Sequence, residues 1–137
     1  MSLNEVTMKL AIIGSRSLSG ICLEKYLPAG VTEIVSGGAK GVDRLAASYA
    51  KEHGIPLTEF LPDYQSYGSA APLVRNRRIA EYADEALVFW DGVSHGTRYT
   101  AEQFRKQGKK VLLFLGDGAP SSTESEKESE NGLLAGR

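Results

Sequence analysis

The stretch of this chain best suited to ligand chemistry is a glycine-rich segment between an apolar segment and an amphipathic one. Residues 36–43 read Ser-Gly-Gly-Ala-Lys-Gly-Val-Asp. Glycines lack the Cβ atom that would keep a ligand away from the backbone. A helix that begins at this point offers free N–H groups and the positive end of its dipole to an anion. A shorter stretch, Gly-Ser-Arg at residues 14–16, has the same setting earlier in the chain. We therefore predict a site for a phosphate-bearing ligand.

The glycine-rich segment does not have the pattern of an NTPase. Lys40 is followed by Gly41 and Val42, so the Gly-Lys-Ser/Thr ending is missing, and with it the hydroxyl that binds Mg²⁺. The dinucleotide-binding fingerprint is also not matched. No Cys or His cluster has metal-ligand spacing. We expect no metal site and no required cofactor, with a nucleotide-type molecule as the ligand.

Three further positions carry groups that suit contacts with a nucleotide-type ligand. Arg75 and Asn76 stand at the end of a long polar segment, and arginine binds phosphate with two parallel hydrogen bonds. The Thr97 hydroxyl, after Gly96, either holds a second phosphate or caps a helix. Asp43 either contacts the helix dipole or accepts a hydrogen bond from a ribose hydroxyl or a neighbouring loop. The predicted ligand-binding residues are Gly14, Ser15, Arg16, Ser36, Gly37, Gly38, Gly41, Asp43, Arg75, Asn76, Gly96 and Thr97.

Strand and helix patterns alternate along the chain, which predicts a mainly parallel sheet with helices on both faces. The expected fold class is α/β, a Rossmann-like three-layer sandwich of about five strands in the order 3-2-1-4-5. Right-handed crossovers bring the loops at 14–19, 36–42, 61–72 and 91–97 to one edge. The expected strands are 9–13, 33–35, 56–61, 85–90 and 111–115, and the expected helices are 19–26, 42–53, 73–82 and 97–107.

Composition predicts one soluble domain. The chain has 137 residues and a formal net charge of −1, which argues against a strongly basic nucleic-acid-binding protein. A single cysteine and the lack of a long apolar run near the N-terminus favour a cytoplasmic protein without a membrane partner. We expect an N-terminal extension at 1–8, partly vector-derived, a Rossmann-like domain at 9–116 and an acidic Ser/Glu-rich tail at 117–137.

Several of these motifs together resemble the SLOG superfamily. This Rossmann-like group includes the DNA-processing protein A proteins, the Lonely Guy enzymes and small stand-alone bacterial proteins of unknown function. The resemblance runs from about residue 9 to residue 115 and implies a nucleotide-derived ligand and a homo-oligomer. The motifs that carry it are residues 14–16, 36–43, 75–77 with Ile79 and Ala80, and 96–97.

One position departs from the Lonely Guy pattern. Thr100 stands where those enzymes carry a catalytic Glu, and a threonine supplies no carboxylate to an oxocarbenium-like transition state. We therefore do not expect the cytokinin-type phosphoribohydrolase reaction.

Three functions remain open from the sequence. The first is a sensor or processing domain that binds a nucleotide-sugar or an ADP-ribose-like molecule. The second is a hydrolase acting on an N-glycosidic or phosphate-linked bond, with Asp43 or Asp91 as the candidate catalytic carboxylate. The third is binding of single-stranded nucleic acid, as in DNA-processing protein A.

Overall fold

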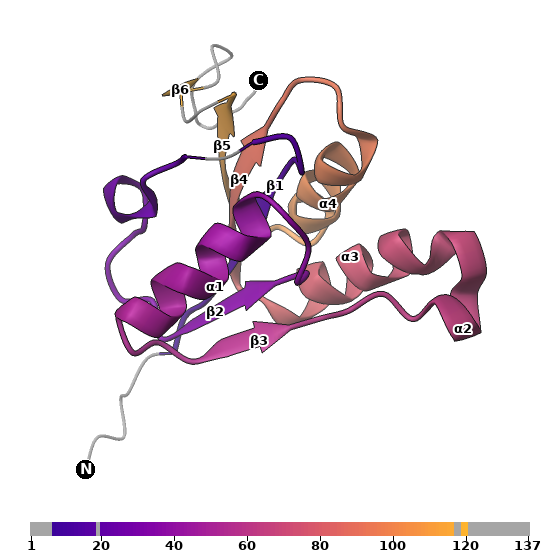
Figure 1. The fold of residues 1–137 in the computed structure, drawn as a ribbon, viewed down its shortest axis with the longest axis horizontal. Coiled ribbons are helices and arrows are strands. Elements are labelled where there is room, and N and C mark those ends of the chain that lie inside the picture. The colour runs from indigo at the N-terminus through magenta and orange to yellow at the C-terminus, as the bar shows by residue number, and fades with distance from the viewer. Residues whose placement is uncertain (1–6, 19, 117–118, 121–137) are drawn as a thin grey trace.

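The computed structural model describes residues 7–18, 20–116 and 119–120. Its elements alternate as the sequence predicts (Figure 1). They are β1 (Lys9–Gly14), the 3₁₀ turn η1 (Leu23–Lys25), β2 (Glu33–Ser36), α1 (Val42–Glu52), β3 (Leu57–Glu59), α2 (Tyr64–Tyr67), the 3₁₀ turn η2 (Gly68–Ala70), α3 (Ala71–Tyr82), β4 (Glu85–Trp90), α4 (His95–Lys106), β5 (Lys110–Leu115) and β6 (Ala119–Pro120).

The first five strands form one parallel sheet in the predicted order β3-β2-β1-β4-β5. The short β6 adds an antiparallel pair at the β5 edge, which the sequence did not lead us to expect. The winding direction reverses between β1 and β4, where Gly14 pairs with Phe89. The loops that leave these two strands therefore begin side by side, at the place where such folds bind ligands.

The core has two halves, one on each face of the sheet (Figure 1). Successive strand residues point to opposite faces. On β1, Leu10 and Ile12 pack with α1, whereas Ala11 and Ile13 pack with α3 and α4. Phe89 and Phe104 are fully buried in opposite halves. Because both faces are covered, the central strands β1 and β4 are apolar after their first residues, as the sequence indicates.

The expected helix at 19–26 is wrong beyond a single turn. Residue 19, its expected cap, lies outside the described residues, and only η1 forms. Gly20 has a φ of +73°, which a right-handed helix does not accommodate, and Cys22 is extended. The expected N-terminal extension and acidic tail also lie largely outside the described residues.

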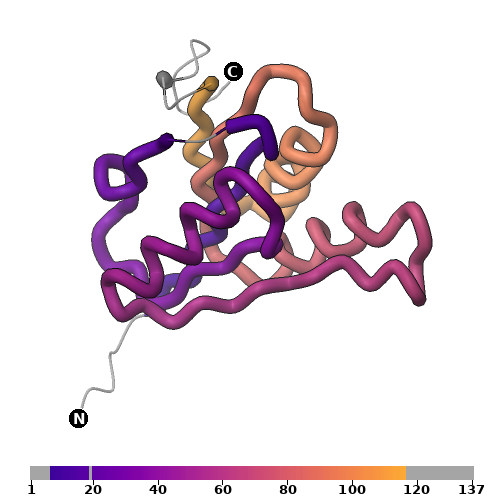
Figure 2. The backbone as a smooth tube through the Cα atoms, viewed as in Figure 1, coloured from indigo at the N-terminus to yellow at the C-terminus, as the bar shows by residue number. Residues whose placement is uncertain are grey.

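The expected loop at 62–69 contains structure that we did not predict. Asp63 caps the short α2 by accepting a hydrogen bond from the Ser66 amide at 3.1 Å. The η2 turn then leads into α3, which begins two residues earlier than expected. This segment between β3 and α3 projects from the body of the domain (Figure 2).

Candidate functional site

A cavity of about 630 Å³ lies at the carboxyl ends of the strands. All four loops that we expected at this edge contribute to its wall. The predicted residues that line it are Gly14, Ser15, Arg16, Gly37, Gly38, Asp43, Arg75, Asn76, Gly96 and Thr97, and the candidate carboxylate Asp91 lines it too.

Two predicted ligand-binding residues, Ser36 and Gly41, do not line the cavity. Each has a structural role instead. Ser36 is fully buried, and its hydroxyl accepts the Gly38 amide at 3.2 Å. Gly41 has a φ of +72°, and a Cβ there would lie 2.9 Å from the carbonyl oxygens of Arg16 and Leu18. A glycine is therefore needed at position 41, where the segment 36–43, here called the glycine loop, packs against the loop that follows β1.

The glycine loop is held in place by side chains of the protein itself. The Ala39 amide donates to the Asp43 carboxylate at 3.0 Å, and the Gly38 amide donates to Ser36. Two amides that an open phosphate cradle would use are therefore already occupied. The loop is a preformed wall of the cavity. A ligand could form hydrogen bonds only with those groups of the loop that are not already bonded to Ser36 or Asp43.

Arg75 anchors the same loop from α3. Its Nη1 donates to the Gly37 carbonyl at 2.7 Å and to the Phe60 carbonyl at 3.3 Å, and its Nε donates to the Asn76 side chain at 2.6 Å. A Cβ on Gly37 would lie 2.8 Å from that Nη1, so a larger residue at position 37 would have to displace the guanidinium. Burial lowers the pKa of Arg75, yet arginine stays protonated.

Asp43 is a buried carboxylate in the first turn of α1, with 8% of its surface exposed. Burial raises its pKa above the usual value. The amides of Ala39 and Gly37 and the charge of Arg75 favour the charged form, but they only partly offset the burial. Within the described part of the chain, Asp43 and Arg75 do not reach ion-pair distance.

Asp91 has the opposite environment. Its Oδ1 accepts the amides of Val93 and Ser94 at 2.9 and 2.8 Å. Its Oδ2 accepts the hydroxyls of Ser94 and Ser17 at 2.7 and 3.1 Å. These bonds, the Val93 amide first, hold the pKa of Asp91 far below its usual value. Asp91 therefore shapes the loop between β4 and α4 and ties it to the β1 loop.

Small hydroxyl side chains form the floor of the cavity next to α4. Ser15, Thr97 and Thr100 are all at least nine-tenths buried. The Ser15 hydroxyl accepts the Asp91 amide at 3.1 Å and lies 3.4 Å from the Thr97 hydroxyl. The Thr100 hydroxyl donates to the Gly96 carbonyl at 2.8 Å. The floor is neutral and polar, without a carboxylate at position 100.

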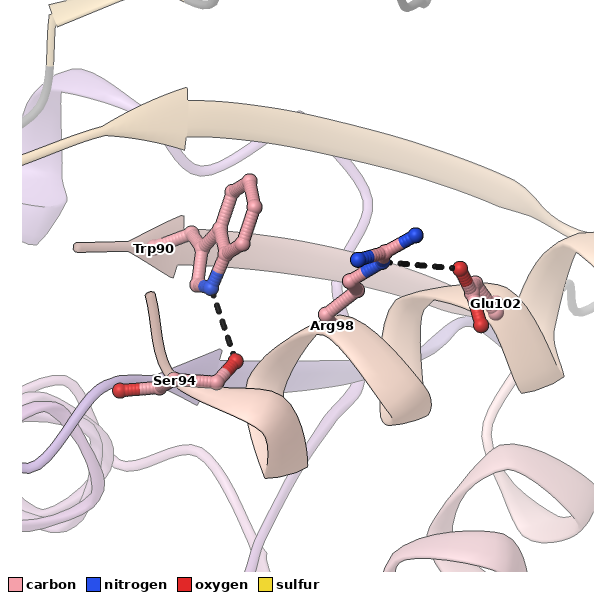
Figure 3. A network of polar contacts seen from close by, with 4 residues as sticks. All are labelled: Trp90, Ser94, Arg98 and Glu102. Atoms are coloured by element: carbon pink, nitrogen blue, oxygen red, sulfur yellow. Dashed lines mark hydrogen bonds and ion pairs between the residues drawn. The ribbon is translucent and has the colours of Figure 1, made fainter. Parts of the chain in front are cut away.

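The helix α4 begins two residues earlier than predicted, so Thr97 is its third residue and not its cap. The preceding loop is further held by Trp90, whose indole N–H donates to the Ser94 carbonyl at 2.9 Å (Figure 3). One turn along, Arg98 and Glu102 pair at 3.2 Å on the exposed surface (Figure 3). Trp90 does not line the cavity, so it is not placed to stack on a ligand there.

Sequence reasoning left several lining residues out of the site. Lys40 and Arg44 are exposed and line the cavity, so with Arg16 they place three cations at its mouth. Their position in the sequence could have identified them. Lys40 lies in the glycine loop, and Arg44 lies in the first turn of α1, which follows it. Including Arg75, four basic and two acidic side chains line the cavity. Pro62, Tyr64 and Pro72 add apolar and aromatic surface to the cavity wall, from the 61–72 loop that we expected at this edge.

Within the described residues, no group of three or more His, Cys, Asp or Glu side chains is placed to hold a metal ion. In the same part of the chain, every helix is too short or too polar to cross a membrane.

A doubly wound parallel sheet with a loop-lined cavity at its switch point defines a Rossmann-like domain. Residues 23–67 match the YAcAr family, described as a YspA, cpYpsA-related SLOG family. This match confirms the resemblance to the SLOG superfamily and includes the glycine loop at 36–43. No curated protein and no solved structure matches the chain significantly.

Proposed function

We propose that this domain binds a nucleotide or a nucleotide-derived ligand, such as a nucleotide-sugar or an ADP-ribose-like molecule, in the cavity at the switch point. The match to a SLOG family indicates a nucleotide-related role. The observation that carries the proposal is the excess of cations around a preformed cavity, with Arg16, Lys40 and Arg44 at its mouth. Such a site attracts an anion by its charge and orients it with fixed groups.

The α4 end of the cavity is the best place for a phosphate. A Cβ on Gly96 would have only the Asn76 amide nitrogen near it, at 3.7 Å, so the backbone there is open to a ligand. The first N–H groups of α4 then carry the positive end of the helix dipole. The Ser15 and Thr97 hydroxyls and the Asn76 amide add neutral donors. By contrast, Ser36 and Asp43 already occupy amides of the glycine loop.

Binding is favoured over hydrolysis by the state of one candidate carboxylate, Asp91, and by the residue at position 100. Asp91 accepts four hydrogen bonds from the protein, which leaves it little capacity to move a proton or to approach a substrate. Thr100 is neutral and bonded to Gly96. We accordingly propose a ligand-binding sensor site and not a hydrolase centred on Asp91 or on position 100.

The test is isothermal titration calorimetry of the full chain with AMP, ADP, NAD and ADP-ribose. Arg16→Ala removes an exposed cation of the cavity mouth and should weaken binding by about three- to tenfold. Arg77→Ala is the matched control, because Arg77 is exposed on α3 but does not line the cavity. Failure of every ligand to bind at millimolar concentration, or equal effects of the two variants, would contradict the proposal.

A further inference from the structure

The two carboxylates of the cavity differ in how many hydrogen bonds they already accept. A carboxylate has about four acceptor positions on its two oxygens. Asp91 uses all of them, because two amides and two hydroxyls donate to it. Asp43 is the more buried of the two, and no described side chain donates a hydrogen bond to it. Its bonds come from the backbone of the glycine loop, at Ala39 and Gly37.

The nearby cation does not satisfy the remaining capacity of Asp43. The Nη1 of Arg75 is directed at the carbonyls of Gly37 and Phe60, and its Nε is bonded to Asn76. A Cβ built on Gly37 would lie 2.8 Å from Arg75 Nη1 and 3.1 Å from Asp43 Oδ2. Both charged groups thus lie beside Gly37, and Asp43 faces the cavity with acceptor positions left over.

A buried carboxylate of this kind selects its ligand by hydrogen-bond donors. It repels a phosphate, whose charge has the same sign, and favours O–H groups that replace the lost water. Of the parts of a nucleotide, the ribose carries two neighbouring hydroxyls, which can donate together to one carboxylate. The apolar wall of Pro62, Tyr64 and Pro72 suits the flat face of a base.

We propose that Asp43 is a specificity-determining residue that accepts hydrogen bonds from a ribose diol, so that the site selects ribonucleotides over deoxyribonucleotides. The inference rests on the proposed function and names the part of the ligand that the glycine-loop side of the cavity recognises. A site whose buried acceptor loses its donor pays the full desolvation of that group, which makes discrimination by a hydroxyl strong.

The experiment removes hydroxyls from the ligand before it changes the protein. By calorimetry, each of AMP, ADP, NAD and ADP-ribose that binds is compared with forms that lack one ribose hydroxyl at a time. At least one such deletion should weaken binding to the unaltered protein by about 10- to 100-fold. In Asp43→Asn the same deletion should cost less than about threefold, because the charged acceptor is gone. Glu52→Gln removes an exposed charge at the other end of α1 and should keep the full discrimination.

The outcomes separate this inference from the proposed function. If a nucleotide binds and every form lacking a hydroxyl binds within about threefold of it, the inference is wrong and the proposed function stands. Discrimination that persists unchanged in Asp43→Asn also overturns the inference. If no nucleotide binds, both fall. Should Asp43→Asn fail to fold, the ligand series with the unaltered protein decides by itself.

Discussion

Substituting Gly96 by alanine separates the fold from the anion site. Gly96 is the second residue of α4 and lines the cavity. A Cβ there would lie 3.7 Å from Asn76 Nδ2, an ordinary contact distance, and the backbone φ is not in the left-handed region. The fold should therefore accommodate an alanine at this position without steric strain.

The expected change in stability is a gain. Alanine restricts the unfolded chain more than glycine does, so Gly96→Ala should raise the free energy of unfolding by about 0.4–1 kcal/mol. The same methyl group would occupy the proposed phosphate position, next to the first N–H groups of α4. Affinity for the tightest-binding nucleotide should fall at least about tenfold, equivalent to about 1.4 kcal/mol.

Urea denaturation and calorimetry on the same preparation measure the two effects independently. A variant that is more stable and binds less tightly supports the phosphate position. Unchanged affinity in a stable variant would refute that position, and a loss of stability would refute the steric argument. Either result is informative because the two measurements are expected to move in opposite directions.

Three further predictions concern the groups that hold the cavity together. Gly37→Ala should destabilise the fold by about 1–3 kcal/mol in urea denaturation, because the added Cβ would lie 2.8 Å from Arg75 Nη1 and has to displace it. A stability equal to that of the unaltered protein would contradict this packing. The folded-state pKa of Asp91 lies below its unfolded value of 3.8, so its contribution to stability is present above pH 3.8 and is lost as the pH falls toward the folded pKa. Asp91→Asn should therefore lower the urea midpoint at pH 7, and its difference from the unaltered protein should shrink at pH values below 3.8. Glu52→Gln, which changes an exposed carboxylate, is the control. A difference in midpoint that does not depend on pH would refute the assignment. Lys109 Nζ donates to the carbonyls of Ala80, Glu81 and Ala83 at the end of α3, so Lys109→Met should cost about 1.5–3 kcal/mol, whereas Lys106→Met on the exposed surface should cost little; equal urea midpoints for the two variants would count against this cap.

Apolar segments and glycine punctuation predicted the strands and the strand order well. The segment 85–90 is apolar after Glu85, and β4 has those bounds. The short helices were predicted less well, because their ends depend on single contacts. In place of the expected helix at 19–26 only the turn at 23–25 forms, because Gly20 has a positive φ. The short α2 depends on the cap that Asp63 provides. The Asp-x-x-Ser spacing at 63–66 was a signal that we did not use.

The sequence by itself determined which loops meet at the cavity. Parallel strands joined by right-handed crossovers leave their carboxyl ends on one edge, so the loops that follow must gather there. Residue types and order therefore indicated where the glycine loop, Arg75 and Thr97 would lie.

Only the tertiary structure decided what each of those residues is free to do. Asp91 is saturated because Ser17, 74 positions away in the chain, donates to it together with its own loop. Arg75 is directed at a carbonyl 38 positions away, and Asp43 keeps open acceptor positions beside it. Hydrogen-bond capacity is used up by neighbours in space, and no local sequence pattern records which neighbours those are. The segment predicted to be an open phosphate-binding loop is therefore a fixed wall whose carboxylate, Asp43, faces the cavity.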